Sequence, residues 1–375
     1  MELKEYELGK LLPYIQPSAY IVNSTKYSDS YKTPVLTAGK SFILGYTDEK
    51  DNIFEDLPVI IFDDFTTATQ YVNFKFKVKS SAMKILKINT ELVNPKYIFY
   101  RMQTIHVDHS THKRYWIQQY SKIKVAIPPL EKQELIIARI EELFSNLDNA
   151  VETLKATQRQ LKFYKQAVLK EVFSNFAEKI PLKEITSVVT SGSRGWAKYY
   201  SDKGARFIRI TDLTRDSIIL KNKEIQRVLL PKNIEGKRSR LQARDVLVSI
   251  TADLGSIALI PENINEAYIN QHIAMIRFIN SNQSEFMAWY LKSNCGQKDL
   301  LRNKRGGGKL GLGLDDIRNT PVPVVNDDIA NQIVEEIKSR LSVCDNIEQI
   351  IDHALSKAKL LRQSILKQAF EGRLI

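Results

Sequence analysis

The chain has 375 residues, which suggests two or three domains, and its 43% of hydrophobic residues is enough to form cores and excludes wholesale disorder. No apolar run approaches the ~18 residues that cross a bilayer, which excludes a membrane-spanning helix. The net charge of +12 favours a polyanionic partner, because each neutralised phosphate releases counterions.

The first region, residues 1–128, has the short apolar runs and turns of a mixed α/β domain. Strands are predicted at 59–62, 72–78 and 122–127, and a short helix at 95–104. Polar and basic side chains gather in two stretches, and we predict that they contact DNA phosphates and base edges. These residues are Thr66, Thr67, Gln70, Lys75 and Lys77 in the first stretch, and His112, Lys113 and Arg114 in the second.

A long helix is predicted over residues 129–176. The segment after Pro129 lacks Gly and Pro and is rich in good helix formers. Pro128 and Pro129 precede it, as prolines often precede or open a helix. Its apolar residues step alternately by four and three, which is the spacing of a coiled-coil seam. The seam residues are Ile136, Ile140, Leu143, Leu147, Ala150, Leu154, Thr157, Leu161, Tyr164 and Val168.

The second region, residues 177–323, is also predicted to be a mixed α/β domain. Strands are expected at 206–210, 245–250, 257–260 and 273–278, and a short helix at 285–294. Residues 182–185 faintly resemble residues 8–11, but the two regions otherwise share little sequence. We call the two globular regions heads. Two different heads, each followed by a long helix, are typical of a protein that recognises two different targets.

The second region also carries candidate DNA contacts. Its glycine-rich basic stretch, residues 300–314, could approach a phosphate closely, but it could also be a solvated loop. The amides of Asn270 and Gln271 could pair with adenine, or could form hydrogen bonds at a strand end. The predicted contacts are Ser193, Arg194, Lys198, Arg209, Lys237, Arg238, Arg240, Asn270, Gln271, His272, Arg302, Lys304, Arg305 and Lys309.

A second long helix is predicted over residues 324–375, and it repeats the first without a gap. Asp148 matches Asp345, an offset of 197 residues, and the same offset pairs Phe173 with Phe370. The seam recurs as well, with Arg340 as its exception, through Ile333, Ile337, Cys344, Ile347, Ile351, Ala354, Ala358, Leu361 and Ile365. We predict that the helices pair as an antiparallel coiled coil holding the two heads apart. The alternative is that each helix lies on its own domain.

Catalytic and metal-binding motifs are not found in the sequence. His106, His109 and His112 are spaced by three, but no cysteine or acid cluster completes a zinc ligand set. Gly308-Lys309-Leu310 lacks the Ser or Thr of a phosphate-binding loop. The stretch beginning at Asn94 lacks the second proline of an adenine methyltransferase motif. We therefore expect no catalytic residue, no metal and no cofactor.

The cysteine content predicts a reducing compartment. Cys295 and Cys344 are the two cysteines, which cannot form a disulfide framework, and Cys344 falls in the predicted seam as a small hydrophobe. The N-terminal residues alternate charged with apolar side chains and lack the pattern of a signal peptide. We expect a cytoplasmic protein.

The whole chain resembles the specificity subunit of type I restriction-modification enzymes. The resemblance is carried by residues 125–133, which lead into the first helix, and by residues 361–374, which close the chain. Residues 204–213 are similar to the opening of a target-recognition domain, and residues 245–249 and 270–272 are similar to its later landmarks. The Pro-Pro-Leu that usually precedes the second helix is replaced here by Pro321-Val322-Pro323.

The resemblance implies an α+β architecture: target-recognition domains at 1–128 and 177–323, and spacer helices at 129–176 and 324–375. Each recognition domain would read half of a split site in double-stranded DNA. The helices would dock adenine methyltransferase subunits, in two copies, and restriction and translocase subunits would join them for phage defence. The S-adenosylmethionine and ATP of those subunits would not bind this chain. The alternatives are a coiled-coil scaffold without DNA specificity, a stand-alone DNA enzyme, and the specificity subunit of a related type IIB or IIG-like system.

Overall fold

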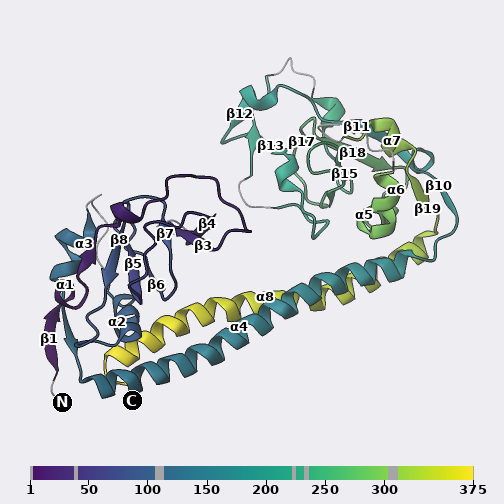
Figure 1. Ribbon diagram of the computed structural model, residues 1–375. Coiled ribbons are helices and arrows are strands. Elements are labelled where there is room, and N and C mark those ends of the chain that lie inside the picture. Colours follow the sequence, from purple (N-terminus) through teal and green to yellow (C-terminus); the bar gives the residue numbers. More distant parts are fainter. Residues whose placement is uncertain are drawn as a thin grey trace. The chain divides into compact units, whose positions relative to one another are not determined.

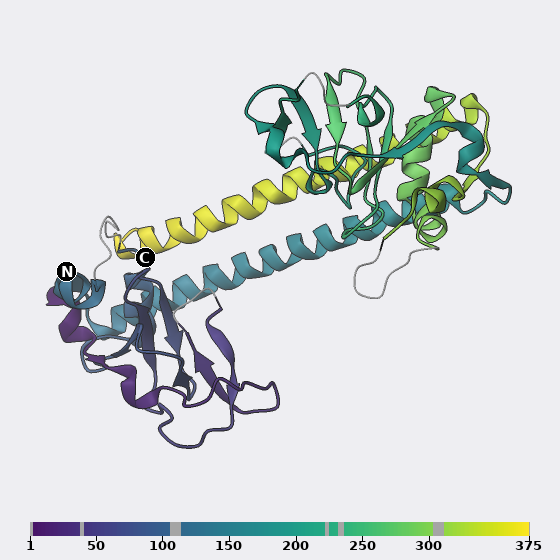
Figure 2. The ribbon, with the colours of Figure 1, turned by 90° about the horizontal axis from the view of Figure 1, so that it is seen from above.

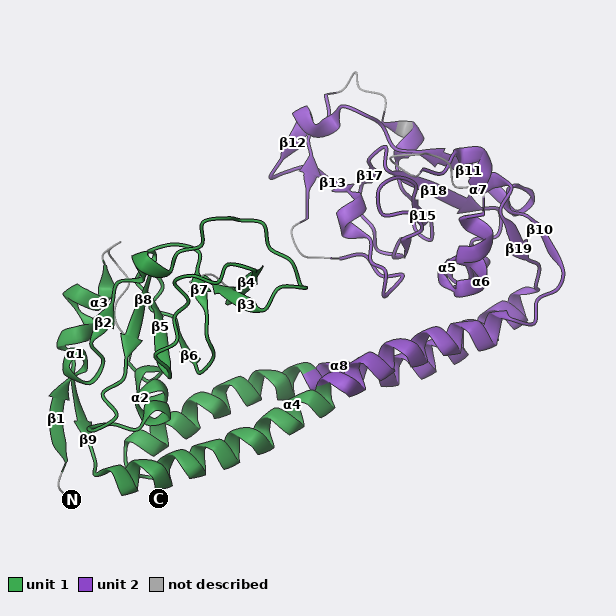
Figure 3. Ribbon diagram, viewed as in Figure 1, with its two compact units in different colours: residues 1–154, 352–375 green, residues 155–351 purple. Residues whose placement is uncertain are grey.

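A computed structural model describes residues 3–37, 41–105, 114–221, 225–231, 236–302 and 311–374. The chain forms two compact units (Figure 3): unit 1 comprises Met1–Leu154 with Asp352–Ile375, and unit 2 comprises Lys155–Ile351. Each unit contains one head of strands and short helices. Each also contains the first half of one long helix and the second half of the other.

The two long helices are confirmed. They are α4 (Leu130–Phe173) and α8 (Asp327–Phe370), each of 44 residues, and both run unbroken along their length (Figure 2). Within unit 2 they are antiparallel, because Lys165 of α4 contacts Glu348 of α8 while Glu171 contacts Arg340. Within unit 1 the start of α4 likewise lies beside the end of α8 (Figure 1).

The repeat reappears as a repeated ion pair. Arg362 Nη1 lies 2.7 Å from Asp148 Oδ1 in unit 1, and Lys165 Nζ lies 2.7 Å from Asp345 Oδ1 in unit 2. Asp148 and Asp345 are equivalent in the repeat, as are Lys165 and Arg362. Burial alone would lower the pKa of Lys165, but its hydrogen bonds to Asp345 and Glu348 outweigh burial and raise that pKa.

The seam is confirmed in part. Ile136, Ile140 and Ile337 are buried as expected, but Tyr164 and Leu361 are 46% and 51% exposed. Phe144 and Leu341 are buried in addition to the predicted set. Arg340, the exception in the seam, makes an ion pair of 2.8 Å with Glu171 and lies over the ring of Tyr164. Its charge therefore stays at the edge of the seam.

The two heads share one topology despite their different sequences. Each has a four-stranded antiparallel sheet, with order β2-β8-β5-β6 in unit 1 and β11-β18-β15-β16 in unit 2. Each also has a second sheet that contains one parallel pair, β3 with β7 in unit 1 and β13 with β17 in unit 2. In each unit a short two-stranded ribbon, β1-β9 or β10-β19, joins the start of the head to its end.

The bounds of the unit 1 elements are β1 (Lys4–Glu7), α1 (Leu8–Leu11), β2 (Tyr14–Ile15), η1 (Pro17–Tyr20), β3 (Thr33–Leu36), β4 (Ile43–Thr47), β5 (Val59–Asp63), β6 (Thr69–Val72), β7 (Lys77–Val78), β8 (Met83–Lys87), α2 (Pro95–Met102), α3 (Tyr115–Gln118), η2 (Tyr120–Lys122) and β9 (Lys124–Ile127). The single strand predicted at 72–78 is wrong, because β6 ends at Val72 and β7 joins a different sheet. Period-two alternation continues through the connection between them and so hides the break.

The bounds of the unit 2 elements are β10 (Lys179–Pro181), η3 (Leu182–Ile185), β11 (Thr186–Ser191), η4 (Trp196–Tyr199), β12 (Tyr200–Ser201), β13 (Ala205–Ile208), η5 (Ile210–Asp212), β14 (Arg227–Val228), η6 (Lys237–Ser239), β15 (Val246–Ser249), β16 (Ile257–Leu259), β17 (Ala267–Ile269), β18 (Ile273–Phe278), η7 (Ser281–Gln283), α5 (Ser284–Lys292), α6 (Asn294–Leu300), α7 (Leu314–Arg318) and β19 (Pro321–Pro323). Residues 8–11 and 182–185, which are faintly similar in sequence, occupy equivalent positions in the two heads, because α1 follows β1 and η3 follows β10.

The core of each head continues onto the long helices. In unit 1, Tyr97, Ile98 and Met102 of α2 belong to the same buried cluster as Ile140 of α4 and Ile365 of α8. Asn94 caps α2 by accepting hydrogen bonds from Lys96 N and Tyr97 N, and Pro95 follows at the first helical position. The cap and the proline fix where α2 begins, and its apolar residues Tyr97, Ile98 and Met102 form the face that packs on the long helices.

Candidate nucleic-acid interface

The turn between β5 and β6 in unit 1 is held rigidly. The Asp63 carboxylate accepts hydrogen bonds from Phe65 N at 2.9 Å and from Thr66 Oγ1 at 2.7 Å. Thr67 adopts a left-handed conformation with φ 59°, which is unfavourable for a β-branched residue. Such strain persists only where the surroundings fix it, and it clusters at functional sites. The turn therefore presents its outer residues in one defined arrangement.

An aromatic side chain projects from this turn. Phe65 is 58% exposed, and Thr66 beside it is also exposed. The buried Asp64 accepts a hydrogen bond from Trp116 N at 2.8 Å, and its carbonyl accepts one from Tyr115 N. The exposed Arg114 immediately precedes Tyr115, so it is held near the turn. Phe65 was not among the predicted contacts, although an apolar ring within a polar turn was a visible signal.

The lysines that follow the turn have different environments. Lys75 is exposed and makes a surface ion pair of 2.8 Å with Glu55, and Gln70 is exposed on β6. The prediction for Lys77 is wrong, because its side chain is buried. Its ammonium donates to the carbonyl of Asp51 at 2.7 Å and lies 3.2 Å from Glu49. A fully engaged, buried ammonium cannot reach a phosphate.

The equivalent turn in unit 2, between β15 and β16, has the same strain and different side chains. Ala252 has φ 58°, in the left-handed region like Thr67. This connection is longer, running from Ile250 to Ser256 against Asp64 to Ala68 in unit 1, and it contains Thr251, Ala252 and Asp253. Ser249 Oγ donates to the carbonyl of Asp253, and the Asp253 carboxylate accepts hydrogen bonds from Ser256 and Arg215. No sequence motif indicated Thr251.

The predicted residues 270–272 form an internal network beside this turn. Gln271 Nε2 lies 2.8 Å from His272 Nε2, and His272 Nδ1 lies 2.6 Å from Thr251 Oγ1. If the Gln271 amide donates, His272 carries its proton on Nδ1 and donates it to Thr251. Asn270 Oδ1 accepts a hydrogen bond from His272 N. These groups are half-buried and bond to one another. Their contacts therefore match the alternative given above, in which the amides form hydrogen bonds at a strand end.

The remaining predicted residues of unit 2 divide by exposure. Ser193 forms a parallel bridge with Asn270 and is half-buried. Arg209 is half-buried too, 3.7 Å from Asp212, and its main chain N–H donates to that carboxylate. The exposed cations are Arg194, Lys198, Arg238, Arg240 and Arg302. The predicted residues His112, Lys113, Lys304, Arg305 and Lys309, and the side chain of Lys237, lie outside what the structure describes.

The long helices expose apolar side chains at equivalent places. Phe163 of α4 is 70% exposed and Leu360 of α8 is 65% exposed, and the two positions match in the repeat. Their neighbours Tyr164 and Leu361 are also equivalent and exposed. Large apolar groups on a helix surface mark contact sites when they cluster. The repeat thus gives each unit one such apolar pair.

The described residues supply neither a metal site nor a membrane span. Within the described ranges, no group of three or more His, Cys, Asp and Glu side chains could hold a metal ion. None of the helices, over the residues that are placed, is both long and apolar enough to cross a membrane.

Comparison with known proteins shows similarity over part of the sequence. Residues 178–356 match the family model described as the type I restriction modification DNA specificity domain. Over 183 residues the chain is 39% identical to the specificity subunit of the Escherichia coli type I restriction enzyme EcoR124I/EcoR124II, covering 45% of each protein. It is 24% identical over 278 residues to the EcoBI specificity subunit of Escherichia coli, covering 66% of this chain and 58% of that one. The aligned stretches thus span about half the length of these relatives.

Solved structures share the fold over the whole chain. A chain from a structural study of complex assembly and conformational transition of the type I R-M system matches with a TM-score of 0.73 at 16% identity, covering 99% of this chain and 98% of that one. The HsdS subunit from Thermoanaerobacter tengcongensis matches with a TM-score of 0.53, also at 16% identity, covering 99% and 97%. Taken together, these comparisons show that the chain is similar in fold to type I restriction-modification specificity subunits, and that residues 178–356 are similar in sequence to their DNA specificity domain.

Proposed function

We propose that this chain is the non-catalytic DNA-recognition subunit of a type I restriction-modification system and acts in the cytoplasm. Each head would read one half of a bipartite site in double-stranded DNA. The proposal rests on one observation above all: two heads whose four-stranded sheets have the same strand order each carry a left-handed residue in the connection between the corresponding two strands, with different side chains in each. Equivalent platforms with different outer residues suit the reading of two different sequences.

The exposed predicted residues remain our proposed DNA contacts. The guanidinium and ammonium groups would bind phosphates and set the register, while the turns would meet base edges. In unit 1, Phe65 joins Thr66 and Arg114 as a group that could contact a thymine methyl or enter a groove. In unit 2, the half-buried Thr251 and Gln271 beside the β15–β16 turn would play this part.

We further propose that the long helices dock two copies of an adenine methyltransferase subunit, and that restriction and translocase subunits join this assembly. Support for two copies comes from the repeat itself. Phe163 with Tyr164, and Leu360 with Leu361, present the same kind of apolar pair at equivalent helix positions. Two equal sites on one chain fit two copies of one partner.

The function is tested by expressing the chain with its methyltransferase subunit and mapping methylated adenines across a genome. We expect a motif of two fixed half-sites separated by a gap of constant length and free sequence. One continuous motif, or no sequence-specific methylation, would contradict the proposal. Binding of the same complex to DNA should weaken steeply with salt, because phosphate contacts release counterions. A scaffold without DNA specificity would show no such dependence.

Replacing Phe65 by alanine is expected to relax recognition at one base position, or two adjacent ones, of a single half-site. The loss of one apolar base contact typically costs about 1–3 kcal/mol, or roughly 5- to 150-fold in discrimination. The measurement is competitive binding with oligonucleotides substituted at each position. Leu3→Ala is the control, because Leu3 is 52% exposed but lies outside the turn. Equal losses at both half-sites would show that Phe65 acts on folding and not on reading.

A further inference from the structure

In each unit a short helix of the head packs on the long helices in the same way. Aligning Pro95 of α2 with Ser284 of α5 matches Tyr97 with Phe286. The Tyr97 ring lies 5.2 Å from Phe370 of α8, and the Phe286 ring lies 5.5 Å from Phe173 of α4. Phe173 and Phe370 are equivalent in the repeat, so the two junctions can be compared residue by residue.

An ion pair with reversed polarity supports this alignment. In unit 1, Lys96 of α2 lies 2.5 Å from Glu141 of α4. In unit 2 the matching positions hold Glu285 and Lys338, 2.9 Å apart. The hydrogen bond to Glu141 also raises the pKa of Lys96. Both junctions therefore use the same contact, with the charges exchanged.

Unit 1 fills the space beside this ion pair with its own aromatic rings. Tyr71 of β6, Phe99 and Tyr100 of α2, and Phe144 of α4 form a continuous series with centroids 5.4–5.7 Å apart. The guanidinium of Arg362 covers the Phe144 ring at 3.9 Å. This junction is closed by ring-on-ring contact, each pair adding about 0.5–1.5 kcal/mol beyond its burial.

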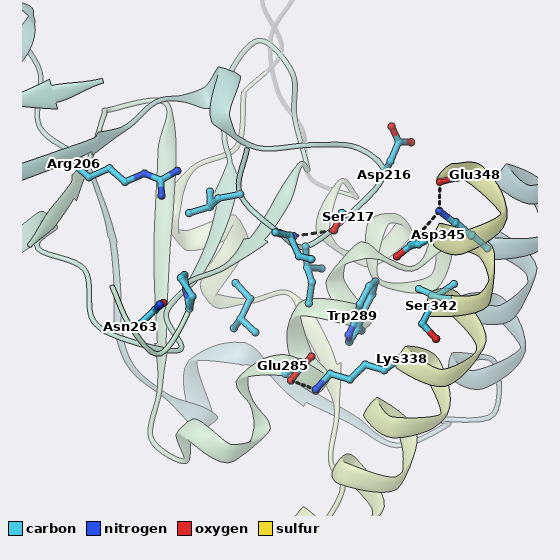
Figure 4. Close-up of a pocket in the computed structure, with 17 residues that line it drawn as sticks. Arg206, Asp216, Ser217, Asn263, Glu285, Trp289, Lys338, Ser342, Asp345 and Glu348 are labelled. Atoms are coloured by element: carbon cyan, nitrogen blue, oxygen red, sulfur yellow. Dashed lines mark hydrogen bonds and ion pairs between the residues drawn. The ribbon is translucent and has the colours of Figure 1, made fainter. Parts of the chain in front are cut away.

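Unit 2 lacks most of these rings and has a cavity there instead. Trp289 matches Tyr100, but Leu341 stands where unit 1 has Phe144, and the edge strand β16 contributes Leu259. The result is a pocket of about 650 Å³ between the head, α5 and α8 (Figure 4). Ile218 and Leu220 complete its apolar wall. This volume lies in the range typical of small-molecule sites.

Five charged side chains around the pocket are paired with one another, while Arg206 donates to the carbonyl of Lys221 and Asp216 lies 3.9 Å from Lys162. Lys338 binds Glu285, and Lys165 binds Asp345 and Glu348, as the dashed contacts in Figure 4 show. A charged ligand beside α8 would have to compete with these ion pairs, whereas a neutral ring could lie against Trp289 and the aliphatic side chains of the wall. The aromatic rings that fill this place in unit 1 therefore indicate the kind of group that fits the open pocket of unit 2.

We propose that the pocket at the head–helix junction of unit 2 binds a small, neutral, planar aromatic molecule, which stacks against Trp289 over Leu341. In the described part of unit 1, Phe144 packs against Tyr100 at the position that Leu341 holds beside the pocket. A bound ring would contact the head, α5 and α8 together, so it would stiffen this junction in one unit only.

The test is a calorimetric titration of the full chain with 2-naphthol, without DNA or a partner subunit. Its outcome is therefore independent of the function proposed above. We expect saturable binding of one molecule with a dissociation constant below about 1 mM, as is typical for a ligand of this size in an apolar pocket. Leu341→Phe should weaken binding at least tenfold, because the new ring takes the place that Phe144 takes in unit 1.

Two further variants keep the test decisive. Ser342 lies at the exposed rim of the pocket, so Ser342→Phe should obstruct entry without disturbing the core. Val343→Phe is the control, because Val343 is 57% exposed on the same helix and does not line the pocket, so binding should be unchanged. Absence of saturable binding would overturn the proposal. Equal affinity in the wild-type, Leu341→Phe and Ser342→Phe chains, each folded by circular dichroism, would overturn it too.

Discussion

Replacing both Phe163 and Leu360 by glutamate is expected to abolish binding of the methyltransferase subunit and, with it, all adenine methylation. Both side chains are largely exposed and occupy equivalent positions on α4 and α8. A carboxylate placed in an apolar interface loses its hydration without gaining a partner, which costs several kcal/mol. A loss of that size reduces affinity by at least about a hundredfold at each site.

The single variants give the sharper result. If each helix position serves one copy of the partner, Phe163→Glu and Leu360→Glu should each leave a complex with one methyltransferase subunit in place of two. Mass photometry or native mass spectrometry of the purified complex measures this directly. Loss of both copies from either single variant would show that the two positions act together at one site.

Leu135→Glu is the matched control. Leu135 is 61% exposed on α4, comparable to Phe163, but its counterpart in the repeat is Gln332. An apolar residue that the second helix does not repeat should not belong to a twofold docking surface. We expect the Leu135→Glu chain to bind two copies with unchanged affinity, and a loss like that of Phe163→Glu would contradict the assignment.

The long helices could be predicted closely because their signals are local. The absence of Gly and Pro over residues 130–176 and 327–371, the heptad spacing and the constant offset predicted helices at 129–176 and 324–375, against Leu130–Phe173 and Asp327–Phe370 in the structure. The seam was predicted less well. Heptad counting takes each helix alone, whereas Phe144 is buried because Tyr100 of the head and Arg362 of the other helix cover it.

The common topology of the heads could not be predicted from one sequence. Strand order depends on pairings far apart in the chain, such as β11 with β18, and the two heads use different side chains for the same pairings. For DNA contacts, composition identified exposed cations such as Arg114 and Arg194 but also selected Lys77. The sequence alone does not reveal that the Lys77 ammonium binds the carbonyl of Asp51 inside the head.

Gly192→Ala is expected to destabilise the head of unit 2 by on the order of 4 kcal/mol, in the range of the most damaging single substitutions. A Cβ atom on Gly192 would lie 2.0 Å from the carbonyl oxygen of Ile269 and 2.3 Å from that of Asn270. Both obstacles are backbone atoms at the end of β17, so no side-chain rotation can relieve the clash. The main chain must therefore move, and this movement would disturb the parallel bridge between Ser193 and Asn270.

The readout must be local, because a chain of two units need not unfold in one step. Hydrogen exchange followed by mass spectrometry should show faster exchange in β11, β17 and β18 of the variant and unchanged exchange in β5 and β8 of unit 1. Gly195→Ala is the control in the same loop. Its Cβ would meet nothing within 4 Å, and its φ of 76° alone costs about 1 kcal/mol. Equal effects of the two substitutions would mean that backbone conformation, and not the close approach at Gly192, holds this loop to the sheet. If Gly192→Ala has the larger effect, the close contact between Gly192 and the main chain at Asn270 holds this loop to the sheet. That contact then also helps to keep Gln271 and His272 in position beside the turn between β15 and β16.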